Sequence, residues 1–411
     1  MNKITKGAAI LFCLLCAAWY CDQTVVQVVP VLGDPSDFKP YHDAARDILA
    51  GRTPFATQGY IYPPLLACLL TPLAPLSYLK ARWVWFLFSQ ACLLAAAWLM
   101  WRATARDWIG ACSIAFVWAV GGAASESLGL GQIGSPLTLL LVLACTQSPW
   151  RQAAALSFGV ALKLIPGALG IVFLLRRQWR AFSVLAAGSL VLLALPWSFV
   201  ACCLSGPKTP AGTDTWTGTP AILSWSLPSV VLRVVDSPPR GGPLPPDWEF
   251  GNDLPNLHLP ASRRWISIGV ALLTLLSGFG VLVFASKGRL SQAQVPFAMA
   301  ALISLSLAAS PVCWTHYQVM QYPGVALLLG HAWRSRRWGL LACALALSAL
   351  LYPAPVQILR FLAMKDGNWK LISHAALYTW TSVTALACLS IFGVLVREAK
   401  LTHQQARSTV S

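Results

Sequence analysis

The chain has 411 residues, of which 57% are hydrophobic and only 11% are charged. Soluble globular proteins carry about 25% charged residues, so this composition excludes a soluble enzyme, a disordered chain and a secreted disulfide scaffold. The long apolar runs lack the alternation of an outer-membrane barrel. We therefore expect an all-α polytopic membrane protein that forms a single integral membrane domain over residues 1–411.

The net charge of +16 invites a nucleic-acid-binding interpretation. A nucleic-acid-binding domain gathers Lys and Arg on one water-facing patch, whereas here these residues stand at the ends of apolar runs. Most of the 12 cysteines lie inside apolar runs, where Cys behaves as a small hydrophobic residue. The sequence thus predicts membrane lipids as partners and no nucleic acid.

The apolar runs predict about 12 transmembrane helices, because each crossing needs about 20 mostly apolar residues. The first run resembles a signal peptide, but it is too long and has no clear cleavage site, so we expect it to be retained. The run at 135–147 is short for a full crossing. In chain order the runs are 7–29, 63–79, 83–101, 108–127, 135–147, 152–175, 181–204, 265–285, 292–309, 317–333, 338–355 and 374–396.

The distribution of charge predicts the orientation of these helices. With the N-terminus inside, 15 of the 30 basic residues fall in short cytoplasmic segments, and most acidic residues fall on the opposite side. This assignment puts Lys80, Arg82 and residues 128–134 inside, and Asp107 outside. We expect a multi-pass protein of the cytoplasmic (inner) membrane, N-in and C-in. Its two long external segments would be 30–62 and 205–264.

The first external segment predicts a short amphipathic helix that begins near Asp37 and lies flat on the membrane surface. Ser36 or Asp37 could cap it, and Gly51 could end it. One apolar face and one polar face follow from the helical spacing. The apolar face would hold Phe38, Tyr41, Ala45 and Ile48 or Leu49, and the polar face Asp43, Arg46 and Asp47.

Asp37 has two interpretations on this helix. It could be a catalytic base at the membrane surface, or it could only cap the helix. A third reading has Asp34 and Asp37 hold a divalent cation through their carboxylate oxygens. The residues alone leave these alternatives open.

The chain resembles glycosyltransferase family 87, membrane enzymes of the GT-C class, through motifs that occur in the same order in both. Residues 37–64 are similar to the family's first loop, with an Asp followed by an aromatic residue, an Ala pair and Tyr-x-Tyr-Pro-Pro. Four shorter segments match further along the chain. They are Gly131-Gln132-Ile133, Leu162-Lys163-Leu164-Ile165-Pro166, Ser224–Arg233 and Ser310-Pro311-Val312-Cys313-Trp314-Thr315-His316.

The resemblance implies a GT-C-like helical bundle whose active site is extracytoplasmic. It implies an inverting, metal-independent glycosyltransferase that moves a mannose-like hexose or arabinofuranose. The donor would be a polyprenyl-phosphate sugar, a co-substrate that leaves no need for a cofactor. The acceptor would be a hydroxyl of a glycolipid or other lipid-linked glycan. Asp37 would be the general base that takes the acceptor proton.

The departing phosphate needs cations, and three residues in the matching segments are candidates: Arg233, His316 and Lys163. Each of the three also has an alternative, structural role. Arg233 could be an interfacial arginine, His316 could pair with Tyr317, and Lys163 could snorkel or pair with Glu126. Candidate substrate-binding residues are Tyr41, Tyr62, Gln132 and Trp314.

Two features do not fit the resemblance smoothly. The predicted topology puts Lys163 near mid-depth and Gln132 near the cytoplasm, so either the helices around 128–166 are broken or short, or these residues are structural. Gly134 and Trp225 stand where the family often has amide side chains.

A transporter or lipid flippase is the alternative function, because many spans and a buried Lys would suit it.

Overall fold

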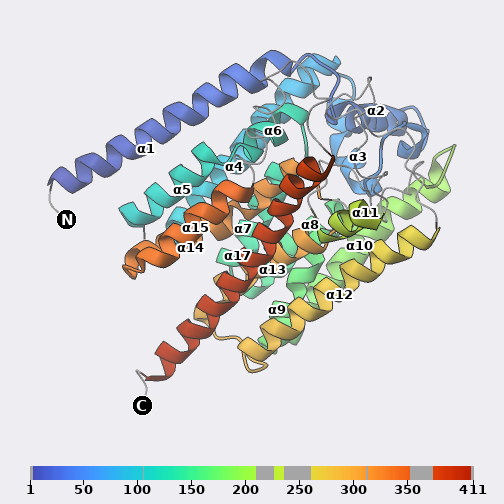
Figure 1. Ribbon diagram of the computed structural model, residues 1–411. Coiled ribbons are helices and arrows are strands. Elements are labelled where there is room, and N and C mark those ends of the chain that lie inside the picture. The colour runs from blue at the N-terminus through green and yellow to red at the C-terminus, as the bar shows by residue number, and fades with distance from the viewer. Residues whose placement is uncertain are drawn as a thin grey trace.

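The computed structural model describes residues 3–104, 106–209, 226–235, 261–311, 313–351 and 374–408. In these ranges the regular elements are helices, and one isolated β-bridge joins Arg52 to Ser205. The prediction of an all-α membrane protein is therefore confirmed. Long helices run side by side through the molecule, and both chain termini lie at the same end (Figure 1).

The elements follow one another with short connections where the structure describes them. In chain order they are α1 Lys3–Gln23, η1 Thr24–Val28, η2 Val29–Val31, α2 Phe38–Leu49, η3 Pro54–Ala56, α3 Pro64–Leu70, η4 Thr71–Leu73, α4 Tyr78–Ala103, α5 Trp108–Val120, α6 Ala123–Leu130, α7 Gly134–Thr146, α8 Pro149–Leu162, η5 Ile165–Gly170, α9 Ile171–Leu175, α10 Trp179–Cys203, α11 Leu227–Val235, α12 Ala261–Ala285, η7 Gln292–Gln294, α13 Val295–Ala309, η8 Thr315–Gln321, α14 Tyr322–Arg334, α15 Trp338–Leu351 and α17 His374–Ser408.

Six stretches of helix in the described chain are long and apolar enough to cross a membrane, or seven if the bent pair α5 and α6 is one span. Four further apolar helices are shorter. The expected number of 12 is therefore not confirmed by this count. The run at 63–79 is wrong as a span, because it folds only into α3 and η4, which end at Leu73. Pro72 lies inside η4 and Pro75 follows its end, so a longer regular helix cannot form here.

Several helices break at one end of the bundle, which we call the site end. The α5 and α6 axes differ by 54° across Gly121 and Gly122. α8 stops at Leu162, and α13 stops at Ala309. α7 has 13 residues and α8 has 14, which gives each about 20 Å of length against a hydrocarbon core of about 30 Å. The alternative of broken or short helices around 128–166 is the one that the structure adopts.

The opposite end, which we call the basic end, carries the two termini and the basic turns after α9, α12 and α14. The Arg334 side chain donates to Asp107 at 2.7 Å there. Asp107 therefore lies at the same end as the basic turns, and the prediction that puts it on the side opposite to them is wrong.

The charge distribution puts Lys80, Arg82 and residues 128–134 on the same side as the chain termini. In the structure they lie at the site end, opposite the termini. The Tyr78 hydroxyl, at the start of α4, donates to the Asp34 carbonyl at 2.9 Å and so ties α4 to the first loop. The cause is the short α3: since the chain does not cross at 63–79, α4 begins at the end where α2 lies.

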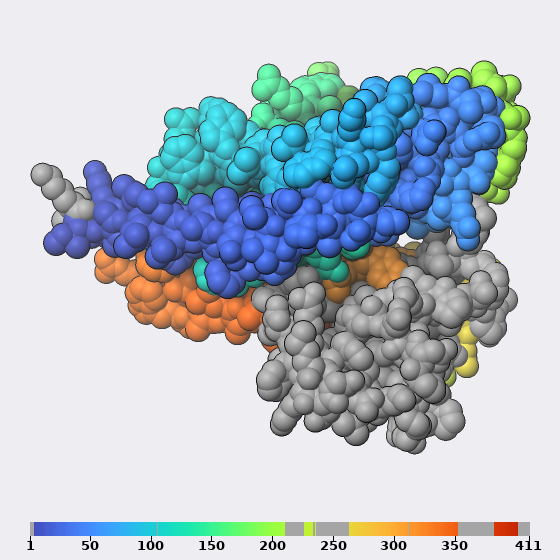
Figure 2. Space-filling model, turned by 90° about the horizontal axis from the view of Figure 1, so that it is seen from above, coloured from blue at the N-terminus to red at the C-terminus, as the bar shows by residue number. Residues whose placement is uncertain are grey.

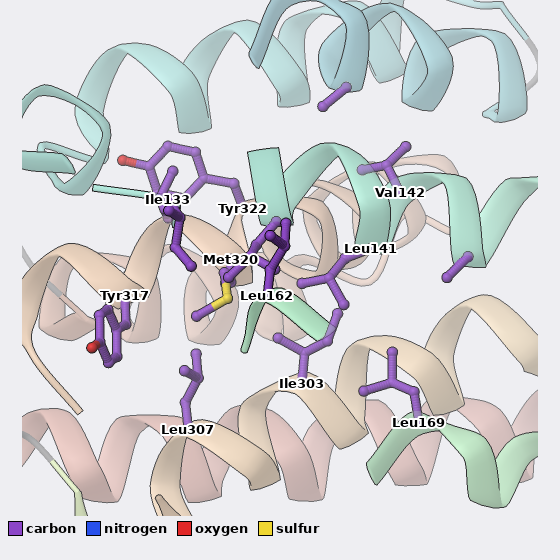
Figure 3. Close-up of a cluster of buried hydrophobic side chains, with 14 of the residues drawn as sticks. Ile133, Leu141, Val142, Leu162, Leu169, Ile303, Leu307, Tyr317, Met320 and Tyr322 are labelled. Carbon is purple, nitrogen blue, oxygen red and sulfur yellow. The ribbon is translucent and has the colours of Figure 1, made fainter. Parts of the chain in front are cut away.

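The bundle has a buried centre and one peripheral helix. α13 is buried along nearly its whole length and packs against α17, α12 and η5. Beneath the helix breaks, apolar side chains of α7, α8, α13 and η8 interdigitate, among them Leu141, Leu162 and Ile303 (Figure 3). α1 instead lies along the outside (Figure 2), and its Ile10 and Leu14 side chains are exposed, as expected for a lipid-facing helix.

Candidate functional site

Asp37 stands directly before α2, and its side chain makes no capping hydrogen bond. The interpretation of Asp37 as a helix cap is therefore wrong. Its carboxylate instead accepts a hydrogen bond of 2.5 Å from the Gln132 Nε2 amide, 95 residues further along the chain. Ser36 is no cap either, because its hydroxyl lies 3.1 Å from the Tyr78 hydroxyl.

Gln132 reaches Asp37 because the chain turns sharply after α6. Gly131 ends α6 in the left-handed region, at φ +70°. A Cβ atom there would lie 2.7 Å from the Phe38 Cβ and 2.9 Å from the Arg82 Cζ. Only glycine fits this position, because it combines a left-handed backbone with close approach of two side chains.

Two side chains of α4 hold this turn in place. Arg82 is fully buried and donates through Nη2 to the carbonyls of Leu128 and Gly129, at 2.5 and 2.7 Å. Trp85 Nε1 donates to the Gly131 carbonyl at 2.8 Å. A guanidinium at the C-terminal end of a helix also complements the helix dipole. These bonds satisfy carbonyls that the end of α6 leaves without helical partners.

The same two α4 residues fix the neighbour of Asp37. The Phe38 ring stacks on Trp85 with centroids 5.8 Å apart, and the Arg82 guanidinium lies 5.8 Å from the Phe38 centroid. α4 therefore positions both partners of the Asp37–Gln132 hydrogen bond. Sequence reasoning missed this role, because Arg82 was interpreted as a topology-determining charge.

Two tyrosines complete the surroundings of Gln132. Tyr41 from α2 and Tyr62 from the start of α3 both donate to Gln132 Oε1, at 2.9 and 3.1 Å. Their rings meet edge to face with centroids 5.1 Å apart. With its oxygen accepting from both hydroxyls, the Gln132 amide must direct its NH₂ group towards Asp37. The structure thus brings together four residues predicted for the site.

Lys163 joins this cluster from the break between α8 and η5. Its Nζ atom lies 3.1 Å from the centre of the Tyr317 ring and 5.6 Å from the Tyr62 ring. It has no hydrogen-bond acceptor among the residues that the structure describes. A buried ammonium without a hydrogen-bond acceptor keeps its donors for another group.

His316 lies next to Lys163, on η8. Its ring meets Tyr317 edge to face, with centroids 4.6 Å apart, so the expected alternative of pairing with Tyr317 is observed. Its Nε2 atom is buried and has no partner in the described part of the chain. Tyr317 itself was named in the sequence only as a partner for His316, although its ring faces Lys163.

The electrostatics of the site centre on Asp37. Burial raises the pKa of this carboxyl, whereas the Gln132 hydrogen bond and the charge of Lys163 lower it. Burial has the largest effect, so the pKa lies above its ordinary value. A carboxylate with a raised pKa is a stronger base than an exposed Asp, which suits proton abstraction.

Other parts of the first loop are structural. Asp47 was expected to face water, but it is buried and accepts hydrogen bonds from the Arg52 side chain and from the Thr57 hydroxyl. The carbonyl of Gly51 accepts from the Ser205 amide at 2.9 Å, which ties the loop to the end of α10. α2 is packed on one face by the protein itself, as the prediction of an amphipathic helix ending near Gly51 requires.

The other residues that the sequence singles out have few described contacts with this cluster. Trp314 directly precedes η8 and is partly buried, close to His316 in sequence. Arg233 lies on α11, and its side chain is outside the described residues, as is Trp225 and most of segment 205–264. Gly134 has no room for the amide side chain common in the family, because a Cβ would lie 2.8 Å from the Ser127 hydroxyl.

The described residues contain no group of three or more His, Cys, Asp or Glu side chains that could hold a metal ion. The sequence alternative of a cation between Asp34 and Asp37 gains no support there. The arrangement instead offers one carboxylate, one ammonium and several ring faces. Such a set can take a proton from a hydroxyl and neutralise a phosphate.

Comparisons with known proteins agree with the resemblance noted in the sequence. The model of glycosyltransferase family 87 matches residues 60–225. Two polyprenol-phosphate-mannose-dependent α-(1-2)-phosphatidylinositol mannoside mannosyltransferases are similar over most of their length. The one from Mycobacterium tuberculosis is 26% identical, covering 84% of this chain and 79% of that protein. The one from Mycolicibacterium smegmatis is 25% identical, covering 84% and 80%.

Among solved structures, ArnT from Cupriavidus metallidurans in the apo state aligns with 97% of this chain and 78% of its own, at 14% identity and a TM-score of 0.44. The same protein bound to undecaprenyl phosphate gives a TM-score of 0.43. The resemblance of this chain to glycosyltransferase family 87 is confirmed by the family match and the two mycobacterial relatives. These matches support a glycosyltransferase.

Proposed function

We propose that this protein transfers a mannose-like sugar from a polyprenyl-phosphate donor to a hydroxyl of a lipid-linked acceptor. The donor class is the one that the names of the mycobacterial relatives state. The proposal rests on one observation: Asp37 is hydrogen-bonded to Gln132 beside Lys163, at the end of the bundle where α6, α8 and α13 end. Both charged groups are buried at the site end of the bundle.

In the proposed reaction Asp37 removes the proton from the acceptor hydroxyl. The acceptor oxygen forms a bond to the anomeric carbon of the sugar while the bond from that carbon to the phosphate oxygen breaks. The electron pair of the broken bond leaves with the polyprenyl phosphate. A single carboxylate suffices for such a displacement, which inverts the anomeric centre, because the phosphate needs no acid to depart.

The developing charge on the phosphate requires a cation. Lys163 suits this role, because its Nζ lies beside the Tyr317 ring without a hydrogen-bond acceptor in the described chain and can bond to a phosphate oxygen. We assign the same role to Arg233 and His316, and assign Tyr41, Tyr62, Gln132 and Trp314 to substrate binding. No cofactor or metal takes part in this scheme. The protein would lie in the inner membrane, N-in and C-in, with the site end extracytoplasmic.

The test is a transfer assay on the full chain in lipid vesicles, with radiolabelled polyprenyl-phosphate sugars and a lipid extract as acceptor. Wild type is compared with Asp37→Asn and with a matched control, Asp43→Asn. Asp43 lies on the same helix and pairs with Lys39 at 2.6 Å. Loss of a general base lowers the rate by about 10²- to 10⁴-fold, whereas the control should keep its activity.

Two outcomes would contradict the proposal. Full turnover by a folded Asp37→Asn protein would remove the base assignment. Absence of transfer from every donor, together with translocation of a fluorescent lipid by the wild type, would favour the transporter or flippase interpretation.

A further inference from the structure

A cavity of about 440 Å³ lies at the basic end, far along α4 from the candidate site. It is formed between the last turn of α4 and the turn that connects α7 to α8. Its lining includes three arginines and no acidic residue among the described residues. The lining residues are Leu99, Arg102, Ala103, Arg106, Leu143, Thr146, Gln147 and Arg151.

The three arginines, Arg102, Arg106 and Arg151, have no acidic partner in the described chain. Asp107, the carboxylate nearest in sequence to Arg102 and Arg106, is already engaged by Arg334 at 2.7 Å and by the Gly110 amide. Three like charges around one cavity repel one another, and an anion inside the cavity would relieve this repulsion.

The surroundings of the cavity indicate where such an anion comes from. Leu94, Trp98 and Trp101 lie on one face of α4 just before the cavity, and all three are exposed. The Arg102 guanidinium stacks over the Trp98 ring at 4.8 Å from its centroid. Trp150, the residue before Arg151, is exposed as well. Tryptophans concentrate where the hydrocarbon core meets the headgroups, so the cavity lies at headgroup level and faces lipid.

We propose that this cavity binds the phosphate headgroup of an anionic phospholipid from the membrane leaflet at the basic end. The planar fork of an arginine binds two phosphate oxygens at once, and basic pockets between helices suit anionic headgroups. The acyl chains would lie along the apolar face of α4. The bound lipid would link α4 to the α7–α8 turn at the end opposite Asp37, so the inference does not depend on glycosyl transfer.

The experiment measures how tightly the purified full chain retains lipid. Native mass spectrometry and thermal-shift titration would follow phosphatidylglycerol against phosphatidylcholine in the wild type and in Arg106→Gln/Arg151→Gln. The matched control is Lys287→Gln/Arg336→Gln. These two residues are exposed at the same end, outside the cavity, and share the left-handed backbone of Arg106. Both double variants lose two positive charges.

We expect the wild type to bind phosphatidylglycerol in preference to phosphatidylcholine. Binding by the cavity variant should be about 30-fold weaker, since each basic side chain near an anionic lipid adds substantially to affinity. The control should bind as the wild type does. Equal losses in both variants would overturn the proposal in favour of diffuse charge attraction. Full displacement of the lipid by inorganic phosphate or glycerol phosphate would overturn it in favour of a small soluble anion.

Discussion

Replacing Gln132 by Leu removes the residue on which three hydrogen bonds of the candidate site meet. The Gln132 amide donates to Asp37 at 2.5 Å and accepts from Tyr41 and Tyr62 at 2.9 and 3.1 Å. Leucine has a similar size but can neither donate nor accept. The variant therefore separates the hydrogen bonds of this side chain from its packing.

The magnitude follows from the charge of the acceptor. A hydrogen bond to an ionised group contributes about 1.5–3 kcal/mol, and each 1.4 kcal/mol changes a rate about tenfold. We expect kcat/KM to fall by about 10- to 100-fold at neutral pH. Two buried tyrosine hydroxyls also lose their acceptor, which costs about 1–3 kcal/mol for each that finds no substitute. The unfolding temperature should fall as well.

The pH dependence of activity should also change in Gln132→Leu, in a direction that a loss of packing does not predict. The Gln132 hydrogen bond lowers the pKa of Asp37 against the effect of burial, so its removal lets the pKa rise further. A general base works when deprotonated, so the acidic limb of the pH–activity profile should move to higher pH in Gln132→Leu. The assay is sugar transfer in vesicles between mildly acidic and alkaline pH.

The control is Gln152→Leu, which replaces another buried glutamine at the start of α8, near the basic end. Its side-chain oxygen has no partner among the described residues. We expect this variant to keep both its kcat/KM and its pH profile. If Gln132→Leu lost activity with an unchanged acidic limb, the reasoning about Asp37 would be refuted.

Three further predictions use other contacts. Lys163→Met should lower kcat/KM for the polyprenyl-phosphate donor by roughly tenfold or more, because it removes a charge proposed to stabilise the departing phosphate, whereas Lys163→Arg should restore part of the activity. Arg82→Met removes the side-chain donor to two carbonyls at the end of α6, so the unfolding temperature should drop in a thermal melt. Arg334 hydrogen bonds hold the pKa of Asp107 below its usual value, so Asp107→Asn should lower the melting temperature at neutral pH. The difference in melting temperature between variant and wild type should vanish as the pH falls through the pKa of Asp107. Protonation of Asp107 in the wild type then removes its interaction with Arg334, as the substitution does.

The sequence by itself determined the class of the protein and the main features of its first loop. Its composition and apolar runs allowed only a helical membrane protein. The spacing of Phe38 and Tyr41 predicted the amphipathic helix, and Gly51 its end. These features follow from local chemistry: helical periodicity, proline and glycine act within a few residues, so they can be read without the fold.

The sequence also found most members of the candidate site, through the order of its motifs. It could not show how Gln132 and Lys163 reach Asp37. A count of apolar residues assumes that every run is one straight crossing, and here 63–79 stops short while 152–175 breaks at Lys163. Hydropathy contains no information about such breaks, because a half-length helix and a full span have the same composition.

Tertiary structure alone decided at which end of the bundle Arg82 lies and what the Gly131 turn does. Arg82 looked like a cytoplasmic charge, since positive residues near helix ends usually set topology. In the fold it is buried against the end of α6, where Arg82 and Trp85 of α4 together donate to three carbonyls. Contacts between residues 46 or 95 positions apart depend on how whole helices pack, and this packing is what places Asp37 beside Gln132.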